Sequence, residues 1–177
     1  DAFVTYLGAD EREDELLLGQ EGGAFARVGQ MFGGTWAADV ELGDFNGDGR
    51  LDAFFGYAAS VSDAEHPDRV WLGAAEGLVD SGQRLGDNDT EDVGVGDFNE
   101  DGIDDVVTVG VLGRALYFGA ADGVLIDSGT MFGDGGARSV RVADLNADGH
   151  LDLLIRYREV WLGRGDGRFD PADDVFE

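Results

Sequence analysis

The sequence DFNGDGRLD at residues 44–52 decides how this chain is interpreted, because it occurs three times in register. The sequences DFNEDGIDD at residues 97–105 and DLNADGHLD at residues 144–152 repeat its aspartates at positions one, five and nine, its asparagine at position three and its glycine at position six. We call these nonapeptides the first, second and third loops and number their positions one to nine. A pattern that recurs about every fifty residues predicts a chain built from repeated structural units.

Short apolar segments flank each loop at corresponding places. Segments that precede the loops alternate or cluster apolar residues and are predicted to be first strands: 38–43, 92–96 and 139–143. Segments that follow the loops are more continuously apolar and are predicted to be buried second strands: 53–57, 106–109 and 153–157. The flanking periodicity is that of β-strands rather than of helices.

A third and a fourth strand complete each unit. The third has an aliphatic, aromatic, apolar, glycine pattern: VWLG at 70–73, LYFG at 116–119 and VWLG at 160–163. A glycine-bracketed acidic turn follows. Weaker fourth strands are predicted at 78–80, 124–126 and 168–170. The sequence therefore predicts four-stranded antiparallel units, each with its loop between the first and second strands.

The amino-terminal segment follows the same pattern from a later starting point. Asp1 corresponds to position nine of a loop, and segments 1–4, 16–19 and 24–27 correspond to second, third and fourth strands. We therefore expect an all-β fold of fifteen strands, whose first unit lacks its first strand and leaves an unpaired edge. Residues 1–177 form one repeat domain in this prediction, with units at about 1–34, 35–87, 88–135 and 136–177.

The loop residues have the chemistry of a hard divalent cation site. Ca²⁺ takes six to eight oxygen ligands from carboxylates, amides, backbone carbonyls and water, and glycine at position six permits a sharp turn. Three calcium sites are predicted, with side chains at positions one, three, five and nine and the backbone carbonyl of position seven as ligands. The ligands are Asp44, Asn46, Asp48, Arg50 and Asp52 in the first loop, Asp97, Asn99, Asp101, Ile103 and Asp105 in the second, and Asp144, Asn146, Asp148, His150 and Asp152 in the third.

Two other interpretations of the loops are weaker. A turn-rich linker also uses Asp, Asn and Gly, but three copies in register, each with the ninth aspartate, argue against it. An EF-hand needs a bidentate Glu at position twelve, where this chain has Phe55, Thr108 and Ile155. Without a cation, three carboxylates in each loop would repel one another.

Composition limits the classes of partner. The chain of 177 residues is 43% hydrophobic, which is compatible with a packed core, and has 38 acidic against 12 basic residues for a net charge of -26. Such a charge disfavours nucleic acid and anionic membranes and favours cations. No apolar run reaches the ~20 residues of a membrane helix, so no membrane insertion is expected. The absence of cysteine excludes disulfides and thiolate metal sites.

The loops and their flanking strands resemble the calcium-binding FG-GAP or VCBS repeats found in integrin α-subunit β-propellers and in many bacterial surface and secreted proteins. That resemblance implies a β-propeller of about four blades, three Ca²⁺ ions and an extracellular or cell-surface location. Asparagine at position three departs from the family's usual aspartate. Propellers of this family usually close with seven blades, so the chain is expected to be a fragment of a larger propeller, a compact ring of four blades, or a subunit that completes its deficient blade with a strand from another chain.

The expected function is a non-enzymatic module for adhesion or structural assembly, with a protein partner or self-assembly through the missing-strand edge. A glycan-binding lectin of the same architecture and the non-catalytic part of a secreted hydrolase are the alternatives. Trp71 and Trp161 are candidate sugar-stacking residues, although their shared register favours packing. Asn88 begins an N-glycosylation sequon and is a candidate glycosylation site. No Ser-His-Asp or Cys-His set is recognisable.

Overall fold

The computed structural model describes residues 2–4, 15–19, 24–31, 37–58, 67–75, 77–86, 89–130, 132–133, 136–156 and 158–172. Within these ranges the chain is all-β and antiparallel, as predicted. Fifteen strands occur in the described residues: β1 (Ala2–Val4), β2 (Glu15–Gly19), β3 (Phe25–Met31), β4 (Asp39–Gly43), β5 (Asp52–Gly56), β6 (Asp68–Ala74), β7 (Gly77–Leu85), β8 (Asp92–Gly96), β9 (Asp105–Val109), β10 (Arg114–Phe118), β11 (Ile126–Asp127), β12 (Val140–Ala143), β13 (Asp152–Ile155), β14 (Glu159–Gly163) and β15 (Phe169–Pro171).

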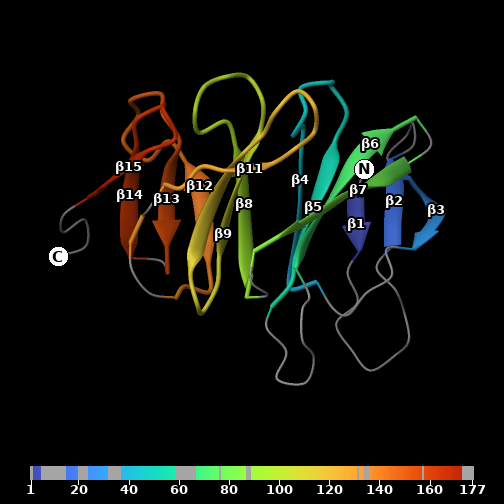
Figure 1. Ribbon diagram of the computed structural model, residues 1–177, viewed down its shortest axis with the longest axis horizontal. Coiled ribbons are helices and arrows are strands. Elements are labelled where there is room, and N and C mark those ends of the chain that lie inside the picture. The colour runs from blue at the N-terminus through green and yellow to red at the C-terminus, as the bar shows by residue number, and fades with distance from the viewer. Residues whose placement is uncertain are drawn as a thin grey trace.

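Each sheet is a meander whose strands are neighbours in sequence order (Figure 1). Three sheets have four strands, in the orders β4-β5-β6-β7, β8-β9-β10-β11 and β12-β13-β14-β15, and one sheet has three, β1-β2-β3. The predicted division into four-stranded units preceded by a three-stranded one is therefore observed in the described residues. Each of the three loops connects the first and second strands of a four-stranded sheet.

Three fourth strands, β3, β7 and β11, differ from their predicted bounds by more than one residue, and β3 extends to Met31 where the prediction ended at residue 27. Strand β7 extends to Leu85 because it continues past Asp80, Ser81 and Gly82, residue types that favour turns, and pairs with β6 again beyond them. The pairing shifts in register between Arg69 and Trp71 of β6. Strand β11 contains only two residues. The N–H of Leu125 donates to the Gln83 side chain at 2.9 Å, and this hydrogen bond takes the place of a sheet hydrogen bond there.

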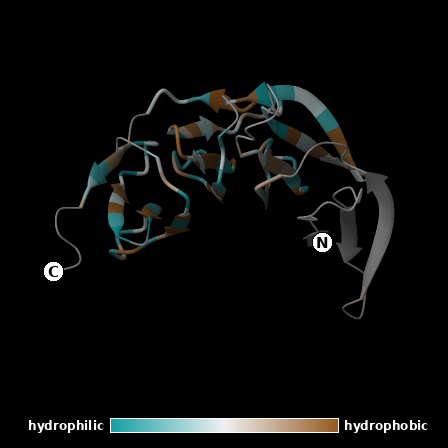
Figure 2. Ribbon diagram, turned by 90° about the horizontal axis from the view of Figure 1, so that it is seen from below, coloured by the Kyte–Doolittle hydropathy of each residue, from teal (hydrophilic) through white to brown (hydrophobic). Residues whose placement is uncertain are grey.

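The first strands of successive four-stranded sheets lie side by side, since β4 contacts β8 and β8 contacts β12. The Asp39 carboxylate accepts a hydrogen bond from the Val93 N–H at 2.9 Å, and the Asp92 carboxylate accepts one from the Val140 N–H at 2.9 Å. The three four-stranded sheets follow one another along an arc (Figure 2). An aspartate near the start of one first strand therefore bonds the first strand of the next sheet.

Apolar side chains fill the spaces between the sheets. One cluster includes Phe45, Phe54 and Val70 from the second unit with Val106 and Tyr117 from the third. Another contains the following buried residues of the third and fourth units: Phe98, Val107, Val109, Leu116, Phe132, Ala137, Val140, Leu153, Ile155 and Phe169. In the described part of the chain, no helix has the length and apolarity required to span a membrane.

Candidate metal centre

All three loops form the same turn. Glycine at position six has a left-handed backbone in each loop, with φ of +83° at Gly49, +88° at Gly102 and +94° at Gly149. A side chain at these glycines would meet open space, so backbone conformation rather than crowding is what favours glycine. The sequence predicted this turn.

Position four is also left-handed, which the sequence did not predict. Gly47 occupies it in the first loop, but Glu100 and Ala147 adopt φ of +58° and +61° in the other two. Non-glycine residues rarely adopt this conformation. Its presence in two such residues shows that the turn is imposed by the hydrogen bonds around it.

Those hydrogen bonds follow the alternation of the sequence. The carboxylate at position one accepts the N–H groups of positions five and six at 2.7–3.2 Å in all three loops. The amide oxygen at position three accepts the position-five N–H at 2.8–3.0 Å, and the carboxylate at position five accepts the position-seven N–H at 2.9 Å. Side-chain oxygens of positions one, three and five therefore all turn toward the loop's own backbone.

The second oxygen of the position-five carboxylate also has a partner. In the first loop Asp48 forms an ion pair with Arg50, Nη2 to Oδ2 at 2.7 Å. In the other loops the position-three amide donates to this oxygen, at 3.1 Å for Asn99 to Asp101 and 2.8 Å for Asn146 to Asp148. The first loop thus differs from the others by having a guanidinium beside a predicted ligand.

The aspartate at position nine has a structural role that the sequence did not reveal. Asp52, Asp105 and Asp152 are fully buried at 0% exposure. One oxygen accepts the position-two N–H at 2.8–2.9 Å, and the other accepts the N–H of the glycine that ends the third strand at 2.6–3.0 Å. This aspartate therefore joins the start of its loop to the adjacent third strand.

Burial of these carboxylates affects their ionisation. Burial raises the pKa of Asp105 to about 6, despite the opposing effect of the hydrogen bonds from the Gly119 and Phe98 N–H groups. The pKa of Asp52 is raised by burial too, against hydrogen bonds from Gly73 and Phe45. A cation close to these groups would favour their ionised forms.

Neighbouring loops are in direct contact. The Asp44 N–H donates to the Asp104 carboxylate at 2.9 Å, and the Asp104 N–H donates to the Asp44 carbonyl at 3.0 Å. Between the second and third loops, the Glu100 carboxylate lies 2.5 Å from His150 Nδ1 and, by this hydrogen bond, raises the pKa of the imidazole. The conformations of the three loops are therefore linked, through positions one and eight between the first and second loops and through positions four and seven between the second and third.

The predicted ligands fit a hard cation in donor chemistry. Among the described residues, however, no three His, Cys, Asp or Glu side chains form a group that could hold a metal ion as they lie. Each carboxylate oxygen can accept more than one bond, so oxygens at positions one, three and five that already accept an N–H retain capacity for a cation. The remaining predicted ligands are the position-seven carbonyls of Arg50, Ile103 and His150 and the buried position-nine carboxylates, each oxygen of which already accepts an N–H.

The other candidate residues are not gathered into a site. Trp71 packs against Phe55, with ring centroids 6.4 Å apart, and Trp161 packs against the cluster between the third and fourth units. Both are partly buried, as expected of packing residues. Asn88 lies outside the described residues.

Comparison with known families agrees with this description of the second loop. Residues 97–155, from position one of the second loop through β13, match the family model described as an FG-GAP-like repeat. A search of curated proteins finds no match. The chain therefore contains an FG-GAP-like repeat at residues 97–155.

Proposed function

We propose that this protein is an extracellular, calcium-stabilised β-propeller-type module that acts in adhesion or structural assembly rather than in catalysis. The observation that carries the proposal is the threefold repetition of one loop geometry, with oxygen ligands of the same type at the same positions. In the proposal, positions one, three, five and nine and the position-seven carbonyl hold Ca²⁺. A bound cation would supply positive charge to three carboxylates that otherwise repel one another.

The chain's own residues account for how such a cation would stabilise the fold. Position one opens the loop directly after a first strand, and position nine begins the second strand. A cation bound by positions one and nine would therefore hold the first and second strands together at the loop. The buried ninth aspartate already bonds both the start of the loop and the third strand. Contacts between neighbouring loops would pass the effect from one unit to the next.

We further propose four blades, of which the first is completed by a strand from another chain. Strand β1 is at the edge of a three-stranded sheet and occupies the place that β5, β9 and β13 hold in the four-stranded ones. Backbone groups at such an edge can pair with an incoming strand. Light scattering in calcium buffer tests this, because a strictly monomeric particle contradicts completion by another chain.

The fourth unit offers a second surface for assembly. Phe45 and Phe98, at position two of the first and second loops, are 0% and 3% exposed. The next unit donates a hydrogen bond to the backbone carbonyl of each, from the Ala120 N–H to Phe45 and from the Gly167 N–H to Phe98. The equivalent Leu145 is 47% exposed. An exposed apolar side chain at a position that is buried in the two preceding loops supports assembly with further protein.

Calcium titration calorimetry tests the proposed function. We expect three binding events for the unmodified protein, and weaker binding when Asp101, at position five of the second loop, is replaced by asparagine. Asp122→Asn is the matched control, since this exposed aspartate lies in the turn after β10, outside the loops, and should leave the titration unchanged. Absence of any heat attributable to calcium, from protein whose fold is verified by circular dichroism, would refute the proposal.

A further inference from the structure

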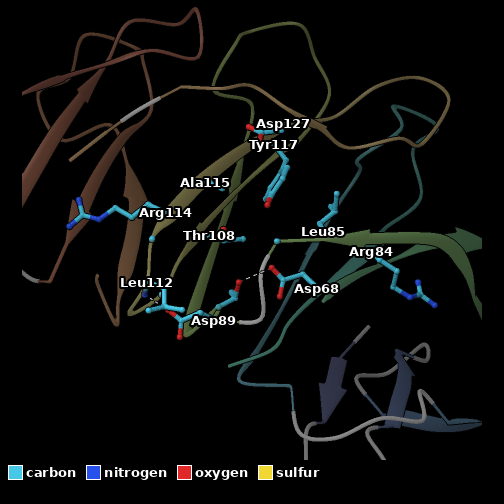
Figure 3. A pocket seen from close by; sticks show the side chains of 14 residues that line it. Asp68, Arg84, Leu85, Asp89, Thr108, Leu112, Arg114, Ala115, Tyr117 and Asp127 are labelled. Carbon is cyan, nitrogen blue, oxygen red and sulfur yellow. Dashed lines mark hydrogen bonds between the residues drawn. The ribbon is translucent and has the colours of Figure 1, made fainter. Parts of the chain in front are cut away.

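A cavity of about 470 Å³ lies between the sheet β4–β7 and the sheet β8–β11 (Figure 3). The cavity lies at the ends of β5 and β9 that are remote from the loops. Asp68, which lines it, pairs with Leu85 and accepts the N–H of Tyr57, just after the end of β5. The loop is at the other end of this strand, which begins at Asp52. The size of the cavity is that of typical small-molecule sites. The cavity is therefore separate from the three candidate metal sites.

The sequence of the third unit explains why space is left here. Thr108, Ala115 and Tyr117 line the cavity, and the residues at the equivalent places in the fourth unit are Ile155, Glu159 and Trp161. All three replacements in the third unit are smaller. Two of them place a hydroxyl where the neighbouring unit has an aliphatic chain or an indole.

A second hollow, of about 380 Å³ and lined by Val111, Ala137 and Arg156 among others, lies at the corresponding end of the next interface. The place equivalent to Thr108, Ala115 and Tyr117 is nevertheless filled by larger side chains there, which makes it an internal reference. There Ile155 is 0% exposed, and Glu159 forms an ion pair at 2.9 Å with Arg114, whose side chain is only 3% exposed. Phe132, 2% exposed, packs in the same cluster. The same sheet-on-sheet arrangement thus has packed side chains at this place in one interface and a polar cavity in the other.

Hydroxyl and carboxyl groups face the middle of the cavity. Figure 3 shows the hydroxyl of Tyr117 and the carboxyl of Asp68 directed inward, with Thr108 between them. Asp68, Thr108 and Tyr117 are all buried, at 1%, 5% and 5% exposure. Gly86 keeps the space beside them open, since a side chain there would come within 3.3 Å of Asp68 Oδ2 and 3.6 Å of the Tyr117 hydroxyl.

Among the charged groups on the lining, the carboxyl of Asp68 is the one directed inward. Asp89 and Asp127 add two further carboxyl groups at the rim, where they accept the N–H groups of Leu112 and Gly129. The guanidinium groups of Arg84 and Arg114 are directed away from the centre in Figure 3 and are paired with Asp80 and Glu159, both at 2.9 Å. An anionic ligand would meet carboxylates without a facing cation, so phosphate, sulfate and acidic sugars are disfavoured.

We propose that this cavity binds one unit of a neutral carbohydrate. Sugar hydroxyls both donate and accept hydrogen bonds, which matches a lining that combines carboxyl acceptors with the hydroxyls of Thr108 and Tyr117. The ring of Tyr117, Leu85 and Ala115 offer apolar surface to the C–H faces of a sugar. An amine would use only the acceptors and would make no use of the Thr108 and Tyr117 hydroxyls as donors. Both Asp68 oxygens already accept one hydrogen bond, from Tyr57 N–H at 2.9 Å and Thr90 Oγ1 at 2.7 Å, so a sugar hydroxyl would be a second donor to either of them.

This inference goes beyond the proposed calcium-dependent module, since it assigns a ligand to a cavity at the opposite end of the sheets. It also provides a sugar-binding location, other than Trp71 and Trp161, for the alternative function of a glycan-binding lectin. The two proposals can be judged separately. Sugar binding with an intact calcium titration supports both, whereas calcium binding without sugar binding supports only the proposed function.

Saturation-transfer-difference NMR and calorimetry on the whole chain in calcium buffer test the proposal. The probes are methyl glycosides of mannose, glucose, galactose and N-acetylglucosamine, with spermidine and N-acetylneuraminic acid as cationic and anionic comparators. We expect binding of at least one neutral glycoside and of neither comparator. Tyr117→Phe should weaken that binding about fivefold, the equivalent of one net hydrogen bond.

Thr108→Ile places the side chain of the fourth unit in the cavity and should weaken binding more than tenfold while the melting temperature is retained. Thr130→Ile makes the same change at a partly buried threonine outside the cavity and should leave binding unchanged. If Thr108→Ile does not fold, Tyr117→Phe alone decides. Binding of spermidine in preference to the glycosides, binding unaffected by Tyr117→Phe, or no binding of any glycoside by folded protein would each overturn the proposal.

Discussion

Replacing Asp68 by asparagine should remove a pH-dependent loss of stability from this protein. Asp68 is 1% exposed, and burial raises the pKa of its carboxyl to about 6, although hydrogen bonds from Thr90 and Tyr57 favour the ionised form. An acid with a higher pKa in the folded state binds its proton more tightly there than in the unfolded chain. Its contribution to stability is therefore present below the ordinary value of 3.8 and is lost as the pH rises through about 6.

The size of this effect follows from the same values. The interval between 3.8 and about 6 corresponds to about 3 kcal/mol, at roughly 1.4 kcal/mol per pKa unit. Asparagine retains an acceptor for the Tyr57 N–H and can donate to the Thr90 hydroxyl, so the site stays occupied. The free energy of unfolding of Asp68→Asn, relative to the unmodified protein, should accordingly rise by about 3 kcal/mol between pH 3.5 and pH 7.

Urea unfolding followed by tryptophan fluorescence, at a series of pH values in constant calcium, measures this difference. Calcium binding and the general acidic repulsion change with pH in both proteins and largely cancel in the comparison. Asp122→Asn, at an exposed turn, should track the unmodified protein throughout. If the free-energy difference between Asp68→Asn and the unmodified protein stays constant within about 0.5 kcal/mol over the series, the reasoning about this buried carboxyl is wrong.

Three further predictions use urea unfolding. Asp105→Ala leaves two buried N–H groups without an acceptor and should lower the free energy of unfolding in EDTA by about 2–6 kcal/mol. Asp101→Ala, in the exposed part of the same loop, should lower it by less than about 1 kcal/mol. Equal losses for the two variants would contradict the structural role of position nine. Gly102→Ala should cost about 1–2 kcal/mol because φ is +88°, and Gly102→Asn should restore part of the loss; a neutral alanine would disprove the backbone argument. Glu159→Ala should destabilise by about 3 kcal/mol, since Arg114 is left buried with its guanidinium unpaired, and an unchanged midpoint would show that the pair contributes nothing.

The sequence predicted the fold as far as local patterns determine it. Three copies of one nonapeptide gave the units, and period-two apolar segments gave each strand within a few residues. The glycine at position six was predicted because its conformation depends on a local turn. Boundaries were wrong where pairing with a neighbour decided them, as at β7, which continues through Asp80 and Gly82 by pairing with β6.

The candidate sites were less predictable because they depend on contacts between distant residues. The ninth aspartate bonds a glycine in the third strand, 11 to 21 residues away, and only the repeated pairing of that aspartate with a strand-ending glycine signals it. The cavity has a sequence signal only in comparison between units, where Thr108 and Tyr117 stand at the places of Ile155 and Trp161. The Thr108 hydroxyl can be recognised as part of a candidate site only once the structure shows that Asp68 of the opposite sheet lines the same cavity.

The effect of calcium on stability tests the central claim most directly. Thermal and urea unfolding should be compared in EDTA and in calcium at about a hundredfold excess over its dissociation constant, where each site that binds only the folded protein adds about 2.7 kcal/mol. Three sites then predict a gain of about 8 kcal/mol, reduced by roughly a third when one loop is inactivated by changing its first and fifth aspartates to asparagine. An unfolding midpoint that is identical in calcium and in EDTA would contradict the account.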